Sequence, residues 1–502
     1  MARTARRLTL VRRAFRPSSA DLGRRVVDGA AFTFLGIAFR IAVTLGSMAI
    51  LARLLTPADF GHIAMATVIT ELAALFANFG FGSILIQRPR IARIQIDTMF
   101  WAACALGALL TAAVFLLSFQ AGALFNDARV GELLRVLCLS FLLEELSVVP
   151  RSLLARLLMF RMDFAVQALM LLCRAGVAVL MALTGWGVWS LVGGALASLL
   201  VQSLAYLLLA GYCPRLRFSR AFLASTWRVN SGYFGNGILF YVNANFDLFL
   251  VGRLLGAVSL GYYQNARSLT DEVRTRMAIP LQRVLFPAFS AVQDDLPRFQ
   301  AGILRSGRLL ALAVIPVGFG IAAVAEELVP ILYGPQWLAM IPILQIIAAS
   351  SGIRAATTIG TPIYNATNRL GLAFRLYLLS TLIFTGSLYL GSHWGVTGVA
   401  WAVLATTPVS VVFLRVALGL VRLDTRAEWR MLGVPTLAAL LMLLAIGVVR
   451  PLLAGVVDAP LFRLALLVLF GVAVYVAAVL IMARSYLDDL RALLRNIGRR
   501  RG

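Results

Sequence analysis

The chain has 502 residues, of which 61% are hydrophobic and 14% are charged, and its mean hydropathy is +0.88. A soluble domain holds about 45–50% apolar and about 25% charged residues, so the composition excludes a soluble globular protein and indicates an integral membrane protein. In a soluble chain the formal net charge of +24 would suggest a nucleic-acid partner. Here the basic residues lie at the chain ends and in alternate connections, which indicates that they orient the protein in the membrane. No nucleic-acid partner is therefore expected.

Apolar segments long enough to cross a membrane recur along the whole sequence. About 20 apolar residues are needed to cross about 30 Å of hydrocarbon as a helix. Fourteen segments fit, at residues 27–52, 62–86, 98–120, 131–150, 164–184, 188–211, 230–252, 262–286, 303–325, 339–364, 372–391, 396–418, 432–450 and 461–483. We therefore predict an all-α integral membrane fold with about 14 transmembrane helices.

The basic residues predict how these helices are oriented. All 46 are arginines, and they gather at the two ends of the chain and in every second connection. Examples from the even-numbered connections are Arg88, Arg90, Arg93, Arg151, Arg156, Arg161, Arg215, Arg217 and Arg220. Because positively charged connections stay in the cytoplasm, both termini and the even-numbered connections are expected there, in contact with anionic membrane lipids.

Two halves of the sequence resemble each other. Shifted by 200 residues, residues 51–66 align with residues 251–266, which places Arg53 over Arg253 and Gly61 over Gly261. Repeated hydrophobic halves are a common design of membrane transporters. Six spans in each half make the halves parallel, because an even number of crossings returns the chain to the side it entered.

The expected organisation follows from this repeat. In chain order it is a cytoplasmic Arg-rich tail at 1–26, an N-lobe of six spans at 27–211, a cytoplasmic linker at 212–229, a C-lobe of six spans at 230–418, two further spans at 419–483 and a basic cytoplasmic tail at 484–502. The outward connections, such as 53–61 and 253–261, are all short. That counts against a membrane polymerase, ligase or glycosyltransferase, which needs a catalytic segment outside the membrane.

Polar side chains at helical spacing indicate which spans line a path. Charged and polar groups inside a bilayer usually face a cavity or a partner, because lipid cannot solvate them. The first, second, seventh and eighth spans each carry such a stripe, in register between the halves. The uncharged cavity candidates are Thr44, Asn78, Asn236 and Asn243.

Deep arginines are the candidate substrate-binding groups. A guanidinium binds phosphate oxygens in a bidentate fork and stays charged when partly buried, so several around one cavity suit an anionic substrate. The candidates are Arg40, Arg174, Arg274, Arg276 and Arg354. The alternative is that some only pair with acids, as Asp271–Arg274 and Glu272–Arg276 can at helical spacing.

Acids within the spans are the candidates for ion coupling or gating. Glu71, Asp247, Asp271 and Glu272 could carry H⁺ or coordinate Na⁺. The sequence has no Walker A motif, so ATP hydrolysis by this chain is not expected. No cofactor, catalytic residue or metal site is predicted.

Several segments in fixed order resemble one family. They are Ile50–Gly61 (ILARLLTPADFG), Ala77–Gln87 (ANFGFGSILIQ), Val251–Tyr263 (VGRLLGAVSLGYY), Arg283–Ser290 (RVLFPAFS) and Ile331–Trp337 (ILYGPQW). These segments are similar to those of the Wzx-type polysaccharide flippases, in the superfamily of multidrug, oligosaccharidyl-lipid and polysaccharide exporters. The branch that looks nearest includes the exporters of colanic acid and other exopolysaccharides.

The resemblance implies a multi-pass flippase of the bacterial inner membrane. Such a protein moves undecaprenyl-pyrophosphate-linked oligosaccharide repeat units to the periplasmic leaflet, for exopolysaccharide, O-antigen or capsule, by alternating access of its two lobes. It also implies a polysaccharide polymerase and a chain-length regulator as partners. Two other functions stay open: a flippase for the peptidoglycan precursor lipid II, and an ion-coupled exporter of small molecules from the same superfamily.

Overall fold

The computed structural model describes residues 39–77, 81–88, 91–224, 234–273, 285 and 287–482. Regular secondary structure in these residues is helical. Contacts divide the chain into two compact units, Met1–Gly261 and Tyr262–Gly502. The boundary falls inside a long helix and not in the expected linker at 212–229. The division into lobes at that linker stays a prediction.

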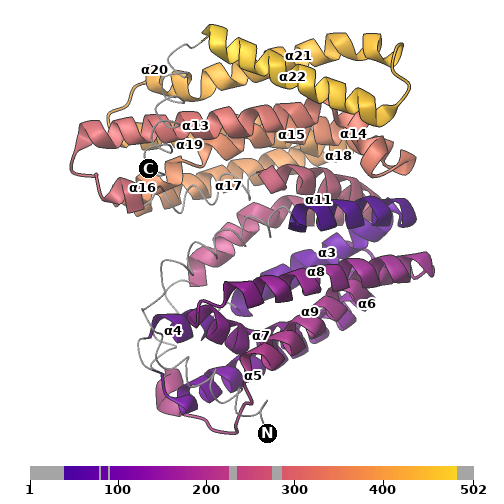
Figure 1. Cartoon of the computed structure of the whole chain (residues 1–502), viewed down its shortest axis with the longest axis vertical. Coiled ribbons are helices and arrows are strands. Elements are labelled where there is room, and N and C mark those ends of the chain that lie inside the picture. Colours follow the sequence, from indigo (N-terminus) through magenta and orange to yellow (C-terminus); the bar gives the residue numbers. More distant parts are fainter. Residues whose placement is uncertain are drawn as a thin grey trace. The chain divides into compact units, whose positions relative to one another are not determined.

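The first unit is built from helices that run along one another (Figure 1). It begins with helical residues 39–54. Its further elements are α3 (Pro57–Ala77), α4 (Phe81–Gln87), α5 (Arg93–Phe125), α6 (Ala128–Leu137), α7 (Leu139–Arg156), α8 (Phe160–Leu183), α9 (Trp189–Ala210) and the first part of α11 (Phe234–Val273). A buried cluster from α4, α5, α7 and α9 forms its core, together with Tyr212 and Phe222.

The second unit packs α13, α15, α19, α21 and α22 around one buried apolar cluster. Its elements after α11 are α13 (Leu296–Ala323), α14 (Ala325–Leu332), a 3-10 turn (Pro335–Met340), α15 (Ile341–Thr357), α16 (Gly360–Ala366), α17 (Leu370–Ser392), α18 (Gly395–Ala405), α19 (Thr407–Leu420), α20 (Thr425–Glu428), a π-helical turn (Trp429–Gly433), α21 (Val434–Ala454) and α22 (Pro460–Met482). In Figure 1, α21 and α22 lie side by side.

The all-α membrane class is confirmed. Among the described residues, 11 helical segments are long and apolar enough to cross a membrane. Three differences separate this number from the expected 14. Segment 27–52 is described only from residue 39. Segment 131–150 is formed by α6 and α7, which carry several charges. Segments 230–252 and 262–286 share the helix α11, and part of the second lies outside the described residues.

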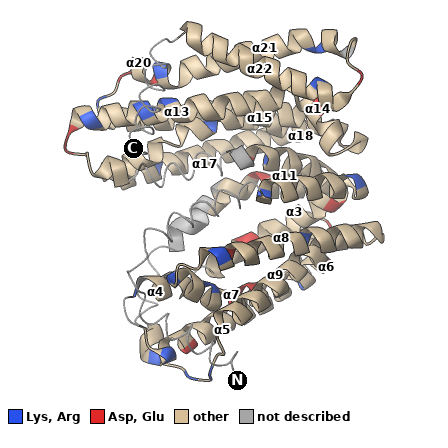
Figure 2. Cartoon of the chain, in the orientation of Figure 1, with Lys and Arg blue, Asp and Glu red and all other residues tan. Residues whose placement is uncertain are grey.

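Two of the expected outward connections contain helical residues. The segment 253–261 lies within α11 and departs from helical geometry at Gly256, with φ 79° and ψ 178°. In 53–61, helix α3 already starts at Pro57. Both were predicted as short connections between spans, and the helical break at residues 55–56 and the irregular Gly256 lie within them. Figure 2 shows the charged residues mostly at helix ends, with long stretches of uncharged residues between them.

Candidate functional site

The repeated segments meet each other within the first unit. A Cβ added to Gly61 would collide with the carbonyl oxygen of Ala257, and one added to Gly261 would collide with that of Pro57. Pro57 and Ala257 are themselves equivalent under the shift of 200 residues. The contact is therefore reciprocal: each copy offers a glycine to the backbone of the other. Backbones come this close only where a glycine leaves room.

The candidate arginines lie in different surroundings. Arg40, in the helix that includes residues 39–54, and Arg174, on α8, are both exposed. Arg354 on α15 is half-buried, and its guanidinium carbon lies 5.4 Å from the ring centre of Phe384 on α17. Such cation–π contact holds an arginine without neutralising it. Arg274 and Arg276 lie outside the described residues.

The candidate acids also differ in environment. Glu71 on α3 is exposed, whereas Asp247 on α11 is buried, and its Oδ1 accepts a hydrogen bond from the Leu248 amide at 2.9 Å. Asp271 accepts a hydrogen bond from Arg267 Nε at 3.2 Å. Of Glu272, only the backbone is described. The expected pairs Asp271–Arg274 and Glu272–Arg276 thus lie outside the described residues, and the structure gives Asp271 a partner one turn earlier.

The uncharged candidates are only partly described. Thr44 is half-buried in the first helix. Asn236 and Asn243 lie on α11, where their side chains are not described, and Asn78 is outside the described residues. The candidates therefore remain proposals as a binding site.

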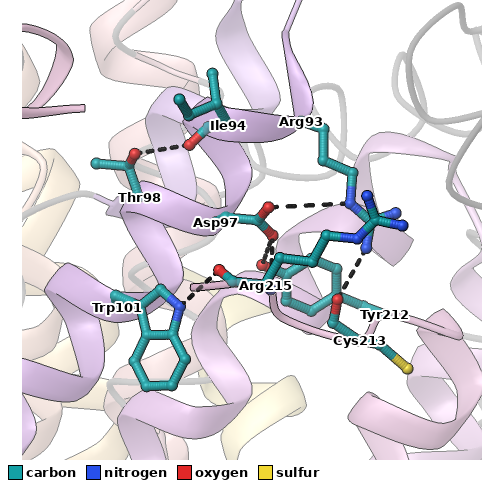
Figure 3. Close-up of polar contacts among 8 residues, drawn as sticks. All are labelled: Arg93, Ile94, Asp97, Thr98, Trp101, Tyr212, Cys213 and Arg215. Carbon is teal, nitrogen blue, oxygen red and sulfur yellow. Dashed lines mark hydrogen bonds and ion pairs between the residues drawn. The ribbon is translucent and has the colours of Figure 1, made fainter. Parts of the chain in front are cut away.

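The sequence did not predict one polar cluster, which is centred on Asp97. Asp97 on α5 is fully buried, at 0% exposure. The Tyr212 hydroxyl donates to its Oδ1 at 2.7 Å, and the Arg215 amide approaches the same oxygen at 3.4 Å (Figure 3). Arg93, one turn earlier on α5, places its Nε 4.0 Å from Asp97 Oδ2. Burial first, and then the Asp97 carboxylate, raises the pKa of the Tyr212 phenol, so it stays protonated and donates.

The same cluster fastens the segment that follows α9. Figure 3 shows Arg93 donating to the Cys213 carbonyl, at 2.8 Å, and the Trp101 indole donating to the Arg215 carbonyl, at 2.9 Å. Together with Tyr212, these bonds hold the start of the predicted linker against the first turns of α5. The sequence signal was an Arg–Asp pair at i,i+4 where the third span begins, followed by a tyrosine where the sixth ends.

A second network joins α7, α8 and α9. Tyr206 donates to Asp163 Oδ1 at 2.5 Å, and Arg151 Nε lies 3.7 Å from the same oxygen. Nearby on α7, Glu145 is 3% exposed, and its Oε2 has no hydrogen-bond partner among the described residues. The acidic doublet that contains Glu145, inside a predicted span, was its sequence signal. A buried acid without a partner is costly unless it is protonated or serves a function.

The arrangement of the helices identifies the fold. The fold is similar to that of the lipid II flippase MurJ in an inward closed conformation, with a TM-score of 0.70 over 92% of this chain and 100% of that one, at 14% identity. It is also similar to an inward-facing multidrug resistance transporter of the MATE family, in the MOP superfamily, with a TM-score of 0.59 over 76% of this chain and 94% of that one, at 14% identity. The chain thus has the MATE/MurJ-like fold.

The sequence places the chain within a family. Residues 50–342 match the family model described as polysaccharide biosynthesis protein, so the chain belongs to this family. It is 27% identical to the lipopolysaccharide biosynthesis protein WzxC of Escherichia coli K12, over 74% of this chain and 76% of that protein. It is 26% identical to the succinoglycan biosynthesis transport protein ExoT of Rhizobium meliloti 1021, over 89% of this chain and 91% of that protein.

These relatives confirm the resemblance found in the sequence. The chain is a multi-pass membrane transport protein of bacterial polysaccharide biosynthesis, from the Wzx-like flippase family, and not an enzyme.

Proposed function

We propose that this protein flips undecaprenyl-pyrophosphate-linked oligosaccharide repeat units across the bacterial inner membrane. The observation that carries the proposal is the similarity to a succinoglycan biosynthesis transport protein over 89% of this chain. A relative from Bacillus subtilis 168, 23% identical over 85% of this chain, is named a teichuronic acid biosynthesis protein. Relatives tied to different polysaccharides suggest a shared lipid carrier and variable sugars.

The chemistry of the first unit supports a pyrophosphate-bearing substrate. Arg40 and Arg174 are exposed, although each lies within a predicted membrane-spanning segment. A charged side chain at such a position normally faces water or a polar partner. Two arginine side chains that keep exposed surface provide forked donors for phosphate oxygens. We assign them to the pyrophosphate, together with Arg274, Arg276 and Arg354.

Alternating access supplies the mechanism. It requires helices that separate and close again at one end of the path. The reciprocal contact of Gly61 and Gly261 marks where the two copies of the repeat cross, because each glycine faces a backbone carbonyl of the other copy. We propose that the path closes at this crossing on the outer side of the membrane, and that both chain termini lie in the cytoplasm. Glu71, Asp247, Asp271 and Glu272 are the acids through which H⁺ or Na⁺ would drive it.

Complementation in a deletion strain tests the function. Loss of the gene should abolish export of the polysaccharide and cause lipid-linked repeat units to accumulate at the cytoplasmic face. A plasmid copy should restore export. Arg40→Ala and Arg174→Ala should each impair this rescue at normal protein levels, whereas Arg129→Ala, which removes an exposed arginine of α6, should not. Normal export from the deletion strain, without accumulation, would refute the proposal.

A lipid II flippase is the second candidate. The structural similarity to MurJ extends over 92% of this chain and 100% of the MurJ chain, with a TM-score of 0.70. That function predicts an essential gene whose depletion stops cell wall synthesis. A viable deletion strain that lacks only a surface polysaccharide would exclude it. Crosslinking in the complemented strain, which carries the plasmid copy, would test whether a polysaccharide polymerase and a chain-length regulator are partners.

A further inference from the structure

A cavity lined by both charged and apolar side chains lies in the second unit. Its volume is about 420 Å³. It is lined by Glu326, Glu327, Pro330, Ile331, Arg450, Pro451, Pro460 and Arg463. These residues come from α14, from the end of α21 and from the start of α22. The cavity therefore belongs partly to the two helices that stand outside the predicted six-helix repeat.

One arginine of the cavity is already held in place. Arg450 Nη1 lies 2.7 Å from Glu326 Oε1, and its Nε lies 3.1 Å from Glu327 Oε1. Its Nη2 donates to the carbonyl oxygen of Ala323. Arg450 thus pairs with both acids and offsets one of their two negative charges, and Arg463 on α22 is the second cation of the lining.

The second oxygen of the Glu327 carboxyl forms no hydrogen bond with Arg450. The Glu327 side chain is 8% exposed, and its Oε2 has no hydrogen-bond partner among the described residues. Burial raises the pKa of this carboxyl, while Arg450 lowers it. A buried acceptor without a donor carries the full cost of its desolvation. The cavity therefore offers a place for a group that donates N–H or O–H bonds.

Arg463, on α22, supplies a positive charge to the lining of the cavity. Arg463 donates from Nε and Nη2 to the Val457 carbonyl, at 3.2 and 2.9 Å. These bonds fix a guanidinium that has five N–H donors in all. A phosphate oxygen is the acceptor that such a fork fits best.

The cavity also lies at the level where lipid headgroups are found. The candidate span of α13 ends at Ala323, that of α21 ends at Leu453, and that of α22 begins at Pro460. Glu327, Arg450 and Arg463 each lie within about one helical turn of such an end. Next to them, Leu452, Leu461 and Phe462 expose 67%, 68% and 58% of their surface. Apolar side chains in this position are suited to acyl chains.

We propose that this cavity binds the phosphoethanolamine headgroup of a membrane phospholipid. The primary ammonium would donate to Glu327 Oε2 and the phosphodiester would accept from Arg463, with the acyl chains along α21 and α22. The two acids and two arginines of the lining sum to zero charge, which matches a zwitterion better than an anionic lipid. The proposal is independent of the transported substrate.

Native mass spectrometry of the purified full-length protein tests this assignment. The lipids are phosphatidylethanolamine, phosphatidylcholine and phosphatidylglycerol with identical acyl chains. Choline carries the same charges but cannot donate a hydrogen bond from its quaternary nitrogen. We expect the wild type to bind the ethanolamine lipid about tenfold more tightly than the choline lipid, the difference that one charge-assisted hydrogen bond provides.

Two variants separate the two ends of the headgroup. Glu327→Gln should bring the ratio of ethanolamine to choline lipid close to one. Arg463→Gln should weaken both lipids by about tenfold and leave their ratio unchanged. Glu132→Gln, at an exposed glutamate of α6, is the matched control and should change neither quantity. If Glu327→Gln fails to fold, Arg463→Gln and the three-lipid comparison still decide the matter.

Several outcomes would overturn the proposal. Equal affinity of the wild type for ethanolamine and choline lipids is one, and a preference for phosphatidylglycerol is another. Retention of the ethanolamine preference by Glu327→Gln would place the selective site elsewhere. Soluble phosphoethanolamine that binds as tightly as the lipid would show that the ligand is not a membrane lipid.

Discussion

The two copies of the repeated segment reach the same close contact by different local chemistry. In the first copy, a break in the helix is closed by a cap: the Thr56 hydroxyl and amide both donate to Asp59 Oδ2, at 2.7 and 2.9 Å, and the Asp59 amide returns a bond to the Thr56 hydroxyl at 3.3 Å. Pro57 follows as the first residue of α3. In the second copy, Gly256 turns the chain with φ 79°.

The two copies share the small residue at the contact and differ in the turn that precedes it. Both copies place a small residue at the contact, because the partner's backbone occupies the space that a side chain would fill. The turn before the contact has only to redirect the chain. A capped break with proline does so with ordinary backbone angles, and a glycine does so with an angle that other residues avoid. The following changes test the comparison, from the largest expected effect to the smallest.

Gly61→Val and Gly261→Val should have the largest effect. Each added side chain would collide with a carbonyl oxygen of the opposite copy, and backbone cannot move aside as a flexible side chain can. We expect a loss of about 3 kcal/mol in stability and of export, since forced overpacking costs about 1–3 kcal/mol. Thermal unfolding in detergent and complementation measure the two effects. Gly176→Ala is the control, because no heavy atom of the described residues lies within 4 Å of its added Cβ.

Gly256→Ala should have the next largest effect. Its combination of φ 79° and ψ 178° is adopted almost exclusively by glycine, and strain of this kind costs about 1–3 kcal/mol. The same thermal unfolding assay should show a loss of about 2 kcal/mol in stability. An unchanged melting temperature would mean that the second copy can turn as the first does.

Thr56→Ala should have a smaller effect, confined to the first copy. It removes the side-chain bonds of the cap but leaves Pro57 in place. Loss of such a cap costs about 1 kcal/mol. Asp59→Ala should destabilise by a similar amount, and the double variant should cost little more than either single change because both act on one motif. Additive losses would show that the two side chains act independently.

Arg253→Gln should have the smallest effect. Arg253 Nη1 donates to the Ala123 carbonyl at 2.7 Å and to Asn126 Oδ1 at 2.5 Å, which ties the second copy to the end of α5. These bonds are exposed, so we expect a loss of about 0.5–1 kcal/mol in the same unfolding assay. A loss as large as that of Gly256→Ala would identify this tie as the main support of the second turn.

The sequence predicted the features that depend on composition and periodicity. Apolar segments of membrane length and few charges sufficed for the all-α membrane class, and the quoted motifs sufficed for the family. The shift of 200 residues also matched Gly61 with Gly261, although it did not predict that the two segments meet. These properties are local or repeated, so they can be read without knowing which helices are neighbours.

Polar partners were harder to predict. Helical spacing allows Asp271 to pair in either direction: with Arg274, which lies outside the described residues, or with Arg267, which is its described partner. The burial of Asp97 and its bond to Tyr212, 115 residues away, could not be read from spacing at all. Contacts of that range depend on how α5 and the end of α9 pack.

By itself, the sequence determined that this protein spans a membrane, carries similar segments at residues 51–66 and 251–266, and belongs to a polysaccharide transport family. Only the tertiary structure decided that Gly61 lies against Ala257, and that Glu327 and Arg463 line one cavity. The physical reason is that transfer into lipid depends on each segment's own composition. A contact between distant segments depends instead on the shapes and directions of whole helices, which no single segment contains.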